Sequence, residues 1–463
     1  MEDFFDRFHA ITGISKYSNS EVITPLNIVK DMVDLLPADV FNPDTKFLDP
    51  AVKSGRFLAE IYRRLFDSSL LSHMNEADRK EHILKNQLFG IATSAAAAAI
   101  VRKQLYADAT IAGNIVYVDR YLTLMTDKGT DFRKLIEKEF GQMKFDVVIG
   151  NPPYQHNDGG GGRGNKATDI FDKFVIFALR ISGRYTVMIT PSKWYNKESL
   201  TEMKTQLISD KHLGALTHFP HSNDVFDADI GGGVSYFLHD KKTQFDNAII
   251  KNITKQSTNA MNRSLCIGDN VILDNKVYHI IEQTIGEKCF VPASGDNPFG
   301  IGSNVYGSPV QEREDDVILV KGQSAFYLER SGLRSPELID KYKCTIGKMN
   351  PDRGGVNGST SWNVINVPKM LKPGYVIPQN FMVLYANKDP QQVINFWTYI
   401  KTKFARFLVL QAMAGVSLAS PDNWKFLPEQ DFSHHWTDQM LYEKYGLSTE
   451  EIEYIENTIK PME

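Results

Sequence analysis

The chain has 463 residues, with 52 Lys and Arg against 56 Asp and Glu and a formal net charge of −4. This length predicts two or three domains. The sequence has no apolar run long enough to cross a membrane, and its N-terminus carries Glu2 and Asp3 in place of a signal-peptide pattern, so we expect a cytoplasmic protein without a membrane partner. Cys266, Cys289 and Cys344 lie far apart with no ligand-like spacing to histidine, which predicts packed thiols and no metal site.

The first predicted helix begins after Thr24 and Pro25. Threonine at an N-cap followed by proline at the first helical position is a favourable helix start. Residues 26–36 then have the apolar spacing of an amphipathic helix. This local chemistry accounts for Thr24 without a ligand.

A nucleotide-cofactor pattern comes next. Residues 45–48 are predicted to form a short strand, residues 49–55 a tight turn rich in small residues, and residues 56–65 a helix. A strand, a tight turn and a helix in this order are typical of nucleotide-cofactor sites in open α/β sheets.

Two more strands are predicted at residues 87–92 and 113–119, with an alanine-rich helix beginning at residue 95 between them. Asp119 ends the second of these strands. Ligands of open α/β sheets bind at the carboxyl ends of the strands, which makes Asp119 a candidate ligand contact. A plain aspartate in a strand-end turn is the alternative.

The most informative motif is Asn151-Pro152-Pro153-Tyr154, which follows the apolar strand predicted at residues 145–150. Two prolines remove two backbone donors and fix two φ angles, so the Pro152 carbonyl is held rigidly. That carbonyl and the Asn151 side-chain oxygen are acceptors suited to the two hydrogens of an amine, and Tyr154 offers a flat ring for stacking. The motif therefore predicts methyl transfer to an amino group. A strand-terminating turn is the alternative interpretation.

This strand and tetrapeptide together resemble the adenine-N6 DNA methyltransferases. The glycine-rich stretch after the tetrapeptide, residues 233–238 and the C-terminal end are similar to restriction-modification methylases of the Eco57I type. The resemblance is strongest over residues 45–240. It implies a Rossmann-like sheet that binds S-adenosylmethionine (SAM) and a separate target-recognition domain that holds double-stranded DNA.

The resemblance also implies roles for individual residues. It assigns catalysis to Asn151, Pro152, Pro153 and Tyr154, and contacts with SAM to Thr24, Asp49, Ala51, Lys53, Ser54, Gly55, Phe57, Asp119 and Asn151. The sequence departs from the family pattern twice. Lys53 stands where the family has glycine, and the second strand ends in Ala92, Thr93 and Ser94 where an acidic residue commonly binds the ribose.

The glycine-rich residues 158–166 are predicted to form a mobile loop, because glycine runs carry a large backbone entropy. Arg163 and Lys166 suggest that this loop orders against a DNA backbone, and a surface linker is the alternative. Phe226 matches loosely the position where the family places a second aromatic residue against the flipped base. A core phenylalanine is the alternative there.

About seven strands with intervening helices are predicted through residue 243, including strands at 185–190, 216–219 and 233–238. We therefore expect an α/β fold with a doubly wound, Rossmann-like SAM-dependent methyltransferase sheet over residues 1–243. Residues 244–463 are predicted to form a mixed α+β target-recognition domain with a helical tail. The tail helix at residues 447–456 has a serine cap with glutamate three residues later.

The charge of the second half is uneven. Residues 341–406 hold ten basic and two acidic residues, whereas residues 427–463 hold nine acidic and two basic residues. A basic segment interleaved with aromatic residues is typical of nucleic-acid contacts, and Lys348 and Arg353 are candidates there. A solvated surface is the alternative.

These observations predict a site-specific DNA adenine-N6 methyltransferase that acts on a flipped adenine, with a separate restriction endonuclease subunit as its possible partner because no nuclease motif stands out. The alternatives left open are a protein glutamine-N5 or RNA methyltransferase and a catalytically decayed DNA-binding specificity protein.

Overall fold

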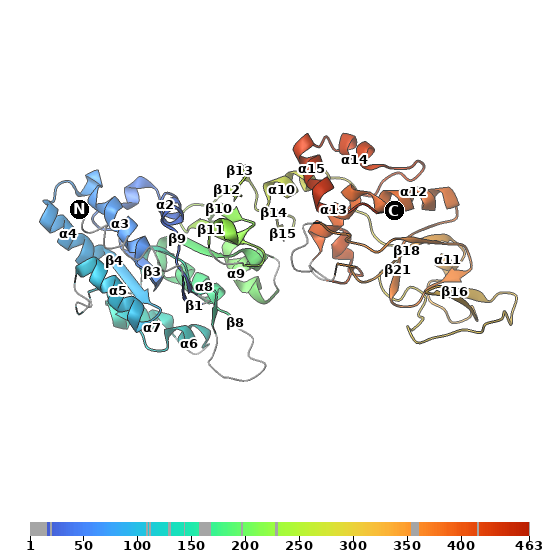
Figure 1. The fold of residues 1–463 in the computed structure, drawn as a ribbon, viewed down its shortest axis with the longest axis horizontal. Helices are drawn as coiled ribbons and strands as arrows, with labels where there is room; N and C mark the ends of the chain where they lie inside the picture. The colour runs from blue at the N-terminus through green and yellow to red at the C-terminus, as the bar shows by residue number, and fades with distance from the viewer. Residues whose placement is uncertain are drawn as a thin grey trace. The chain divides into compact units, whose positions relative to one another are not determined.

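The computed structural model describes residues 16–18, 21–107, 110, 113–127, 131–142, 144–156, 168–195, 198–226, 230–352, 361–413 and 416–462. The chain forms two compact units, Met1–Asn275 and Lys276–Glu463. Figure 1 shows the first unit in blue to green and the second in yellow to red.

A nine-stranded mixed sheet organises the first unit, with the strand order β13-β12-β10-β11-β9-β6-β3-β4-β5. Its strands are β3 (Phe47–Val52), β4 (Leu88–Ala92), β5 (Ile115–Tyr117), β6 (Phe145–Gly150), β9 (Ser182–Pro191), β10 (Leu213–Phe219), β11 (Val234–Asp240), β12 (Ala248–Ile253) and β13 (Thr258–Arg263). The pairs β3–β4, β3–β6, β4–β5 and β6–β9 are parallel, whereas β11 runs antiparallel to both β9 and β10. The carboxyl ends of β3, β4, β5 and β6 therefore lie at one edge of the sheet.

The first unit also contains helices. They are α2 (Leu26–Val33), α3 (Arg56–Phe66), α4 (Glu76–His82), α5 (Ala95–Tyr106), α6 (Tyr121–Thr126), α7 (Phe132–Phe140), α8 (Phe171–Ile181) and α9 (Thr201–Ile208). Helices α3 and α5 pack on β3 and β4, and α8 packs on β6 and β9. Every residue of β3 and β4 is buried, which is typical of strands covered on both faces.

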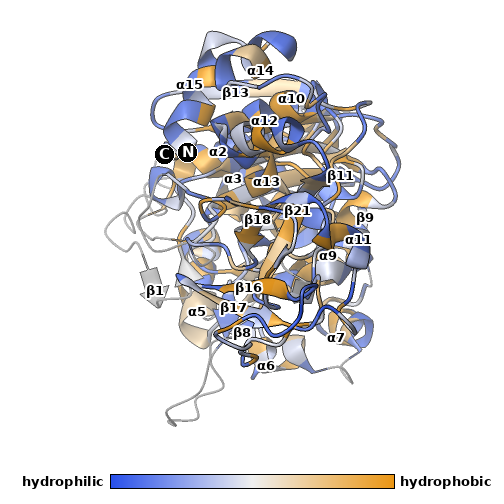
Figure 2. Ribbon diagram, turned by 90° about the vertical axis from the view of Figure 1, so that its right-hand side faces the viewer, coloured by the Kyte–Doolittle hydropathy of each residue, from blue (hydrophilic) through white to orange (hydrophobic). Residues whose placement is uncertain are grey.

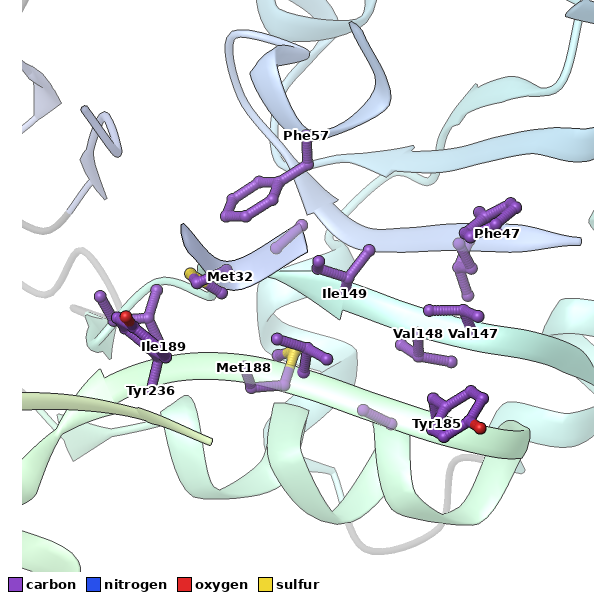
Figure 3. Close-up of a cluster of buried hydrophobic side chains, with 14 of the residues drawn as sticks. Met32, Phe47, Phe57, Val147, Val148, Ile149, Tyr185, Met188, Ile189 and Tyr236 are labelled. Carbon is purple, nitrogen blue, oxygen red and sulfur yellow. The ribbon is translucent and has the colours of Figure 1, made fainter. Parts of the chain in front are cut away.

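The core of the first unit is one continuous cluster of apolar side chains. Figure 3 shows part of it, with Val147 and Ile149 of β6 lying between Phe47 of β3 and Met188 of β9. Val147, Ile149, Phe47 and Met188 are fully excluded from solvent. The apolar run that predicted β6 therefore exists because this strand lies in the middle of the sheet.

The sequence predictions for the first unit are confirmed in their main features. All seven predicted strands belong to the nine-stranded sheet, and the alanine-rich segment forms α5 with Ser94 as its N-cap. The compact unit, however, ends at Asn275 rather than at residue 243. The difference arises because β12 pairs in parallel with β10 and carries β13 along its outer edge.

Three two-residue to three-residue ladders complete the first unit. They are β1 (Lys16–Ser18) with β2 (Glu21–Val22), β7 (Gln155–His156) with β8 (Thr168–Asp169), and β14 (Cys266–Ile267) with β15 (Asn270–Val271). The β7–β8 ladder lies directly after Tyr154 in the chain. The predicted loop at residues 158–166 falls between these two strands and outside the described residues.

The second unit contains two three-stranded sheets and six helices among its described residues. Its strands are β16 (Val317–Lys321), β17 (Ser324–Leu328), β18 (Tyr342–Gly347), β19 (Lys369–Leu371), β20 (Tyr375–Val376) and β21 (Phe381–Asn387). Its helices are α10 (Asn275–Glu282), which starts at the boundary, α11 (Pro336–Ile339), α12 (Pro390–Lys401), α13 (Lys403–Ala412), α14 (Asp438–Lys444) and α15 (Thr449–Thr458). The sheet orders are β17-β16-β20 and β19-β18-β21. This matches the predicted mixed α+β character.

The C-terminal helix α15 forms where the sequence predicted it. Ser448 and Glu451 make a reciprocal capping box at its start. Figure 2 shows α14 and α15 largely in hydrophilic colours and β16 in the hydrophobic colour, in keeping with the buried Val317 and Leu319.

Two of the ten basic residues at 341–406 do not belong to a surface. The Lys343 ammonium is buried and donates to four backbone carbonyls, those of Leu338, Ile339, Lys341 and Lys372. Burial lowers its pKa to about 8. Arg406 is buried as well, and burial lowers its pKa to about 10. These two side chains are structural, so the basic surface is smaller than the sequence suggested.

The cysteines differ in environment. Cys344 is buried and Cys266 is partly buried, but Cys289 is exposed, so the expectation of packed thiols is wrong for Cys289. Among the described residues, no group of three or more His, Cys, Asp or Glu could hold a metal ion. No helix in the described part of the chain is long and apolar enough to span a membrane.

Two buried histidines predict an acid-sensitive fold. Burial lowers the pKa of His218 on β10 and of His239 on β11 to about 4, below the value near 6.5 of an exposed histidine. The unfolded chain then binds more protons between pH 6.5 and 4. The contribution of each histidine to the free energy of unfolding is fully present above pH 6.5. It is lost as the pH falls toward 4, by up to roughly 3 kcal/mol for each histidine.

Urea unfolding at pH 7, 5.5 and 4.5 measures this loss. The double variant His218→Asn and His239→Asn should lose less stability over the same range than the parent. Equal losses in the two proteins would show that other groups cause the acid sensitivity.

Candidate active site

The site forms where two neighbouring parallel strands end. Phe47 and Leu48 of β3 pair with Val147 and Val148 of β6, so the segments that follow both strands meet at the same edge of the sheet. This pairing brings the predicted cofactor turn and the tetrapeptide together, although they lie about 100 residues apart in the chain.

A small cavity marks this meeting point. Its volume is about 20 Å³, which is space for roughly one water molecule. It is lined by residues from the N-terminal segment, the β3–α3 turn and the end of β6, namely Ile23, Thr24, Asp49, Ala51, Lys53, Ser54, Gly55, Arg56, Phe57 and Asn151. Thr24, Asp49, Ala51, Lys53, Ser54, Gly55, Phe57 and Asn151 were all predicted as cofactor contacts from the sequence, and the structure brings these eight together.

The β3–α3 turn explains why lysine replaces glycine at position 53. Gly55 has a φ of 73° and is the N-cap of α3, a backbone conformation that favours glycine. Lys53 does not have a positive φ. The turn therefore needs glycine at position 55 but accepts a side chain at position 53.

The Asp49 carboxyl is buried beside this turn and accepts a hydrogen bond from the Ala51 N–H at 3.0 Å. Burial raises the pKa of Asp49 to about 7, an effect that the Ala51 hydrogen bond and the Lys53 charge partly oppose. Near neutral pH, a bound cation would therefore shift this carboxyl toward its ionised form.

The Asn151 side chain is held by Thr24. Its amide Nδ2 donates to Thr24 Oγ1 at 3.0 Å, in a buried environment. The Thr24 carbonyl in turn accepts from Arg56 Nη1 at 2.9 Å. Because an asparagine amide has its NH2 group and its oxygen on opposite sides, the bond to Thr24 fixes the direction in which Oδ1 points.

The rest of the tetrapeptide is also buried. Pro152, Pro153 and Tyr154 follow Asn151 without regular secondary structure. Tyr154 is 8% exposed, and its ring packs edge-on against Phe171, with ring centroids 6.4 Å apart. Burial raises the pKa of the Tyr154 hydroxyl, which has no hydrogen-bond partner among the described residues. The ring can stack on a base only after the side chains that cover it move aside.

Gly150 allows β6 to approach β3 closely. A Cβ at this position would lie 2.6 Å from Asp49 Oδ1 and 3.4 Å from Pro50 Cδ. On the other side, the Tyr121 hydroxyl donates to the Pro50 carbonyl at 3.0 Å. The position of the end of β3 therefore depends on glycine at position 150, which leaves room for Asp49, and on the buried hydrogen bond from Tyr121 to Pro50.

Asp119 and Phe226, like Pro152, Pro153 and Tyr154, do not line the cavity. Asp119 follows β5 at the same edge of the sheet, is exposed, and accepts from the Tyr117 hydroxyl at 3.4 Å. Phe226 is buried within the apolar core, which matches the alternative interpretation of a core residue. Ala92 ends β4 and packs against Ala97 and Ala98, so it offers no polar group to a ribose.

Besides the tetrapeptide and Phe226, four more residues were predicted to contact DNA. Arg163, Lys166 and Arg353 fall outside the described residues. Lys348 lies in the second unit, where its ammonium pairs with the Asp296 carboxylate.

Sequence reasoning missed Ile23, Arg56 and Tyr121. Arg56 lies between two predicted site residues, Gly55 and Phe57, so its position next to the cavity could have been predicted from the sequence. The role of Tyr121 depends on the packing of α6 near the end of β3, and no pattern in the sequence indicates it.

The chain is similar in sequence to known methylases. Residues 86–226 match the family model of the Eco57I restriction-modification methylases. A protein from Mycoplasma pneumoniae (strain ATCC 29342 / M129), described as an uncharacterized adenine-specific methylase, is 30% identical over 305 residues, which cover 52% of this chain and 72% of that protein. The chain belongs to this family of adenine-specific methylases. The family predicted from the tetrapeptide is thereby confirmed.

The Eco57I-type region of the methylase contains Asp119 and the whole tetrapeptide, whereas Thr24 and the β3–α3 turn precede it. The methylase is also similar to two solved structures. The methyltransferase subunit of a type I restriction-modification system from Streptococcus thermophilus is 15% identical, with a TM-score of 0.38, over 58% of this chain and 54% of that one. The type ISP restriction-modification enzyme LlaGI, as a nuclease-deletion mutant with a DNA substrate mimic, is 10% identical, with a TM-score of 0.44, over 86% of this chain and 52% of that one. The methylase spans about half the length of these two proteins.

The contact between Gly150 and Asp49 predicts the effect of Gly150→Ala. The new methyl group would displace the buried Asp49 carboxyl from its bond with Ala51, which should lower the free energy of unfolding by about 1–3 kcal/mol. Urea unfolding of parent and variant measures the difference.

Gly231→Ala is the matched control, because a Cβ there meets no atom within 4 Å. Its stability should stay within about 0.5 kcal/mol of the parent. A Gly150→Ala variant as stable as this control would mean that β3 and β6 are less closely packed than we describe.

Proposed function

We propose that this methylase is a site-specific DNA adenine-N6 methyltransferase, which uses SAM and acts on an adenine flipped out of double-stranded DNA. The observation that carries the proposal is the position of Asn151. Its side chain forms part of the same cavity wall as Asp49, Lys53 and the β3–α3 turn. One end of the tetrapeptide thus reaches the predicted cofactor residues.

The cavity residues fit the amino-acid end of SAM in chemistry. That end carries an ammonium and a carboxylate, and the cavity offers the Asp49 carboxyl and the Lys53 ammonium. The N-terminus of α3, at Gly55 and Arg56, also favours a negative group. Thr24, Ala51, Ser54 and Phe57 complete the wall. Because the cavity holds only about one water, its lining residues must move apart before a whole cofactor enters.

When bound, SAM supplies an electrophilic methyl group. The residues of this chain hold and orient the amine that receives it. The bond from Asn151 to Thr24 fixes the amide, and Oδ1 on the other side of the amide is the proposed acceptor for an exocyclic amine. The Pro152 carbonyl is the second acceptor, held rigidly by the two proline rings.

These two acceptors orient the nitrogen lone pair away from conjugation with the base. In the transfer, the bond between the SAM sulfur and the methyl carbon would break as the nitrogen–carbon bond forms, which would release S-adenosylhomocysteine, and the nitrogen would then lose a proton to solvent. Positioning of this kind supplies most of the acceleration, and the proposal requires no metal and no covalent intermediate. Tyr154 would stack on the flipped base once its ring is uncovered, and Asp119, which follows β5 at the same edge of the sheet, would contact the adenine of the cofactor.

The proposed setting is a restriction-modification system in which a separate chain carries the endonuclease. The family match to restriction-modification methylases supports this setting. Glutamine side chains of proteins and RNA are the rival substrates, since the tetrapeptide suits any planar amine or amide. A specificity protein without catalysis is the rival from another class.

Asn151→Ala tests the catalytic assignment. It should lower methyl transfer from tritiated SAM to unmethylated duplex DNA at least about 100-fold, because one of two positioned acceptors is lost. Isothermal titration of the variant should still show SAM binding within a few-fold of the parent.

Asn86→Ala is the matched control, since Asn86 is exposed on the first unit and lies outside the cavity. It should keep full activity. Normal transfer by Asn151→Ala would remove the catalytic role. Loss of SAM binding together with transfer would reduce Asn151 to a cofactor contact.

The pKa of Asp49 predicts how SAM binding depends on pH. Its folded value, about 7, lies above the ordinary value of 3.8, so the neutral form is favoured below pH 7. A cationic ligand favours the ionised form. Affinity should therefore increase with pH, by up to about tenfold per unit below pH 7, and level off above pH 7.

Calorimetry in two buffers with different ionisation enthalpies measures the number of protons released when SAM binds. About half a proton should be released per SAM at pH 7. The release should vanish in Asp49→Asn. An unchanged release in that variant would assign the proton to another group.

A further inference from the structure

The second unit contains a groove that the cofactor site does not explain. Its volume is about 930 Å³. It lies at the end of β18 and at the start of β19 and β21. It is lined by Thr345, Ile346, Gly347, Lys348, Met349, Asn350, Pro351, Asn366, Val367, Lys369, Asn380, Phe381 and Val416. These residues include two lysines and three asparagines but no aspartate or glutamate.

Backbone hydrogen bonds hold the wall of this groove in place. The Lys348 N–H donates to the Asn380 carbonyl at 3.0 Å, and the Leu418 N–H donates to the Lys348 carbonyl at 2.7 Å. The Asn366 amide donates to the Met349 carbonyl at 2.7 Å. Gly347 makes room for this amide, since a Cβ there would lie 3.0 Å from Asn366 Nδ2. Hydrogen bonds within the protein therefore define the shape of the wall without a ligand.

The groove exposes polar groups that have no side-chain partner among the described residues. Lys369 is exposed and makes no ion pair among the described residues, and the exposed Asn380 amide makes no side-chain hydrogen bond there. Met349, Val367 and Val416 are 56%, 57% and 40% exposed, which is unusual for apolar side chains gathered in one place. Cations, a free amide and apolar groups thus share one concave surface.

One of the two groove lysines, Lys348, forms an ion pair within the protein. The Lys348 ammonium pairs with the Asp296 carboxylate, whose side chain is 77% exposed. Lys348 holds the pKa of Asp296 below its usual range. The Lys348 side chain is only 19% exposed, but its partner Asp296 is open to solvent, so another anion can replace Asp296 as the partner of Lys348.

We infer that this groove binds duplex DNA, with Lys348 and Lys369 on phosphates and Asn380 on a base edge. The inference rests on the proposed function and adds the surface that the substrate contacts. A free asparagine amide matches the donor and acceptor of adenine in the major groove, and apolar side chains contact the thymine methyl. The absence of acids from the described lining is the charge complementarity that a phosphate backbone requires.

The test measures binding of the full chain to a fluorescent 200-base-pair plasmid fragment at several KCl concentrations. Lys348→Ala and Lys369→Ala should each weaken binding severalfold and reduce the salt slope of log affinity by about 1. Asp296→Asn should strengthen binding, because it removes the competitor for Lys348. Lys388→Ala is the matched control, an exposed lysine of the same unit outside the groove, and it should bind as the parent does.

Asn380→Ala separates base reading from general attraction. The set of adenines methylated on plasmid DNA should become broader in this variant, with SAM affinity unchanged. Parental affinity and salt slope in both lysine variants, or an equal loss in Lys388→Ala, would overturn the inference. Tighter binding of an RNA hairpin than of the duplex would overturn it as well.

The test also separates this inference from the proposed function. If the parent methylates DNA and the groove variants bind normally, the groove assignment fails and the proposed function stands. If the parent binds duplex through the groove but transfers no methyl group to it, the groove assignment stands and the proposed function fails.

Discussion

The parallel pairing of β3 with β6 is the constraint on which the rest of the candidate site depends. It places the ends of two segments distant in sequence at one edge of the sheet, so Asp49 and Asn151 share a cavity. The approach is close enough that only glycine fits at position 150. Thr24 then joins both sides, since its hydroxyl accepts from Asn151 and its carbonyl accepts from Arg56. The residues predicted to bind the cofactor and the tetrapeptide thus pack together.

Much of the first unit could be predicted from the sequence because its signals are local. The apolar runs of β3, β4 and β6 and the turn at Gly55 each follow from a few neighbouring residues. Strands β12 and β13 were missed because their exposed residues give a weak pattern, and their assignment depends on pairing with β10. The same limit applies to Tyr121, whose hydroxyl acts on Pro50 from 71 residues away.

Charge in the second unit shows a different limit. A count of basic residues cannot separate Lys343, whose ammonium is enclosed by backbone carbonyls, from Lys369, which is exposed in a groove. Only the fold makes this separation, because burial depends on how β18 and α11 pack. What remains at the surface is a smaller set of cations with amides and apolar groups beside them. This set is more informative about a ligand than the net charge of the segment.

The measurement that tests the central claim most directly is the identity of the methylated product. The full chain is incubated with tritiated SAM and unmethylated duplex DNA, and the DNA is digested to nucleosides and separated. The account predicts that the label appears in N6-methyldeoxyadenosine. Label in methylated cytosine would contradict the assignment of the amine. Label in protein or RNA, with none in DNA, would contradict the assignment of the substrate.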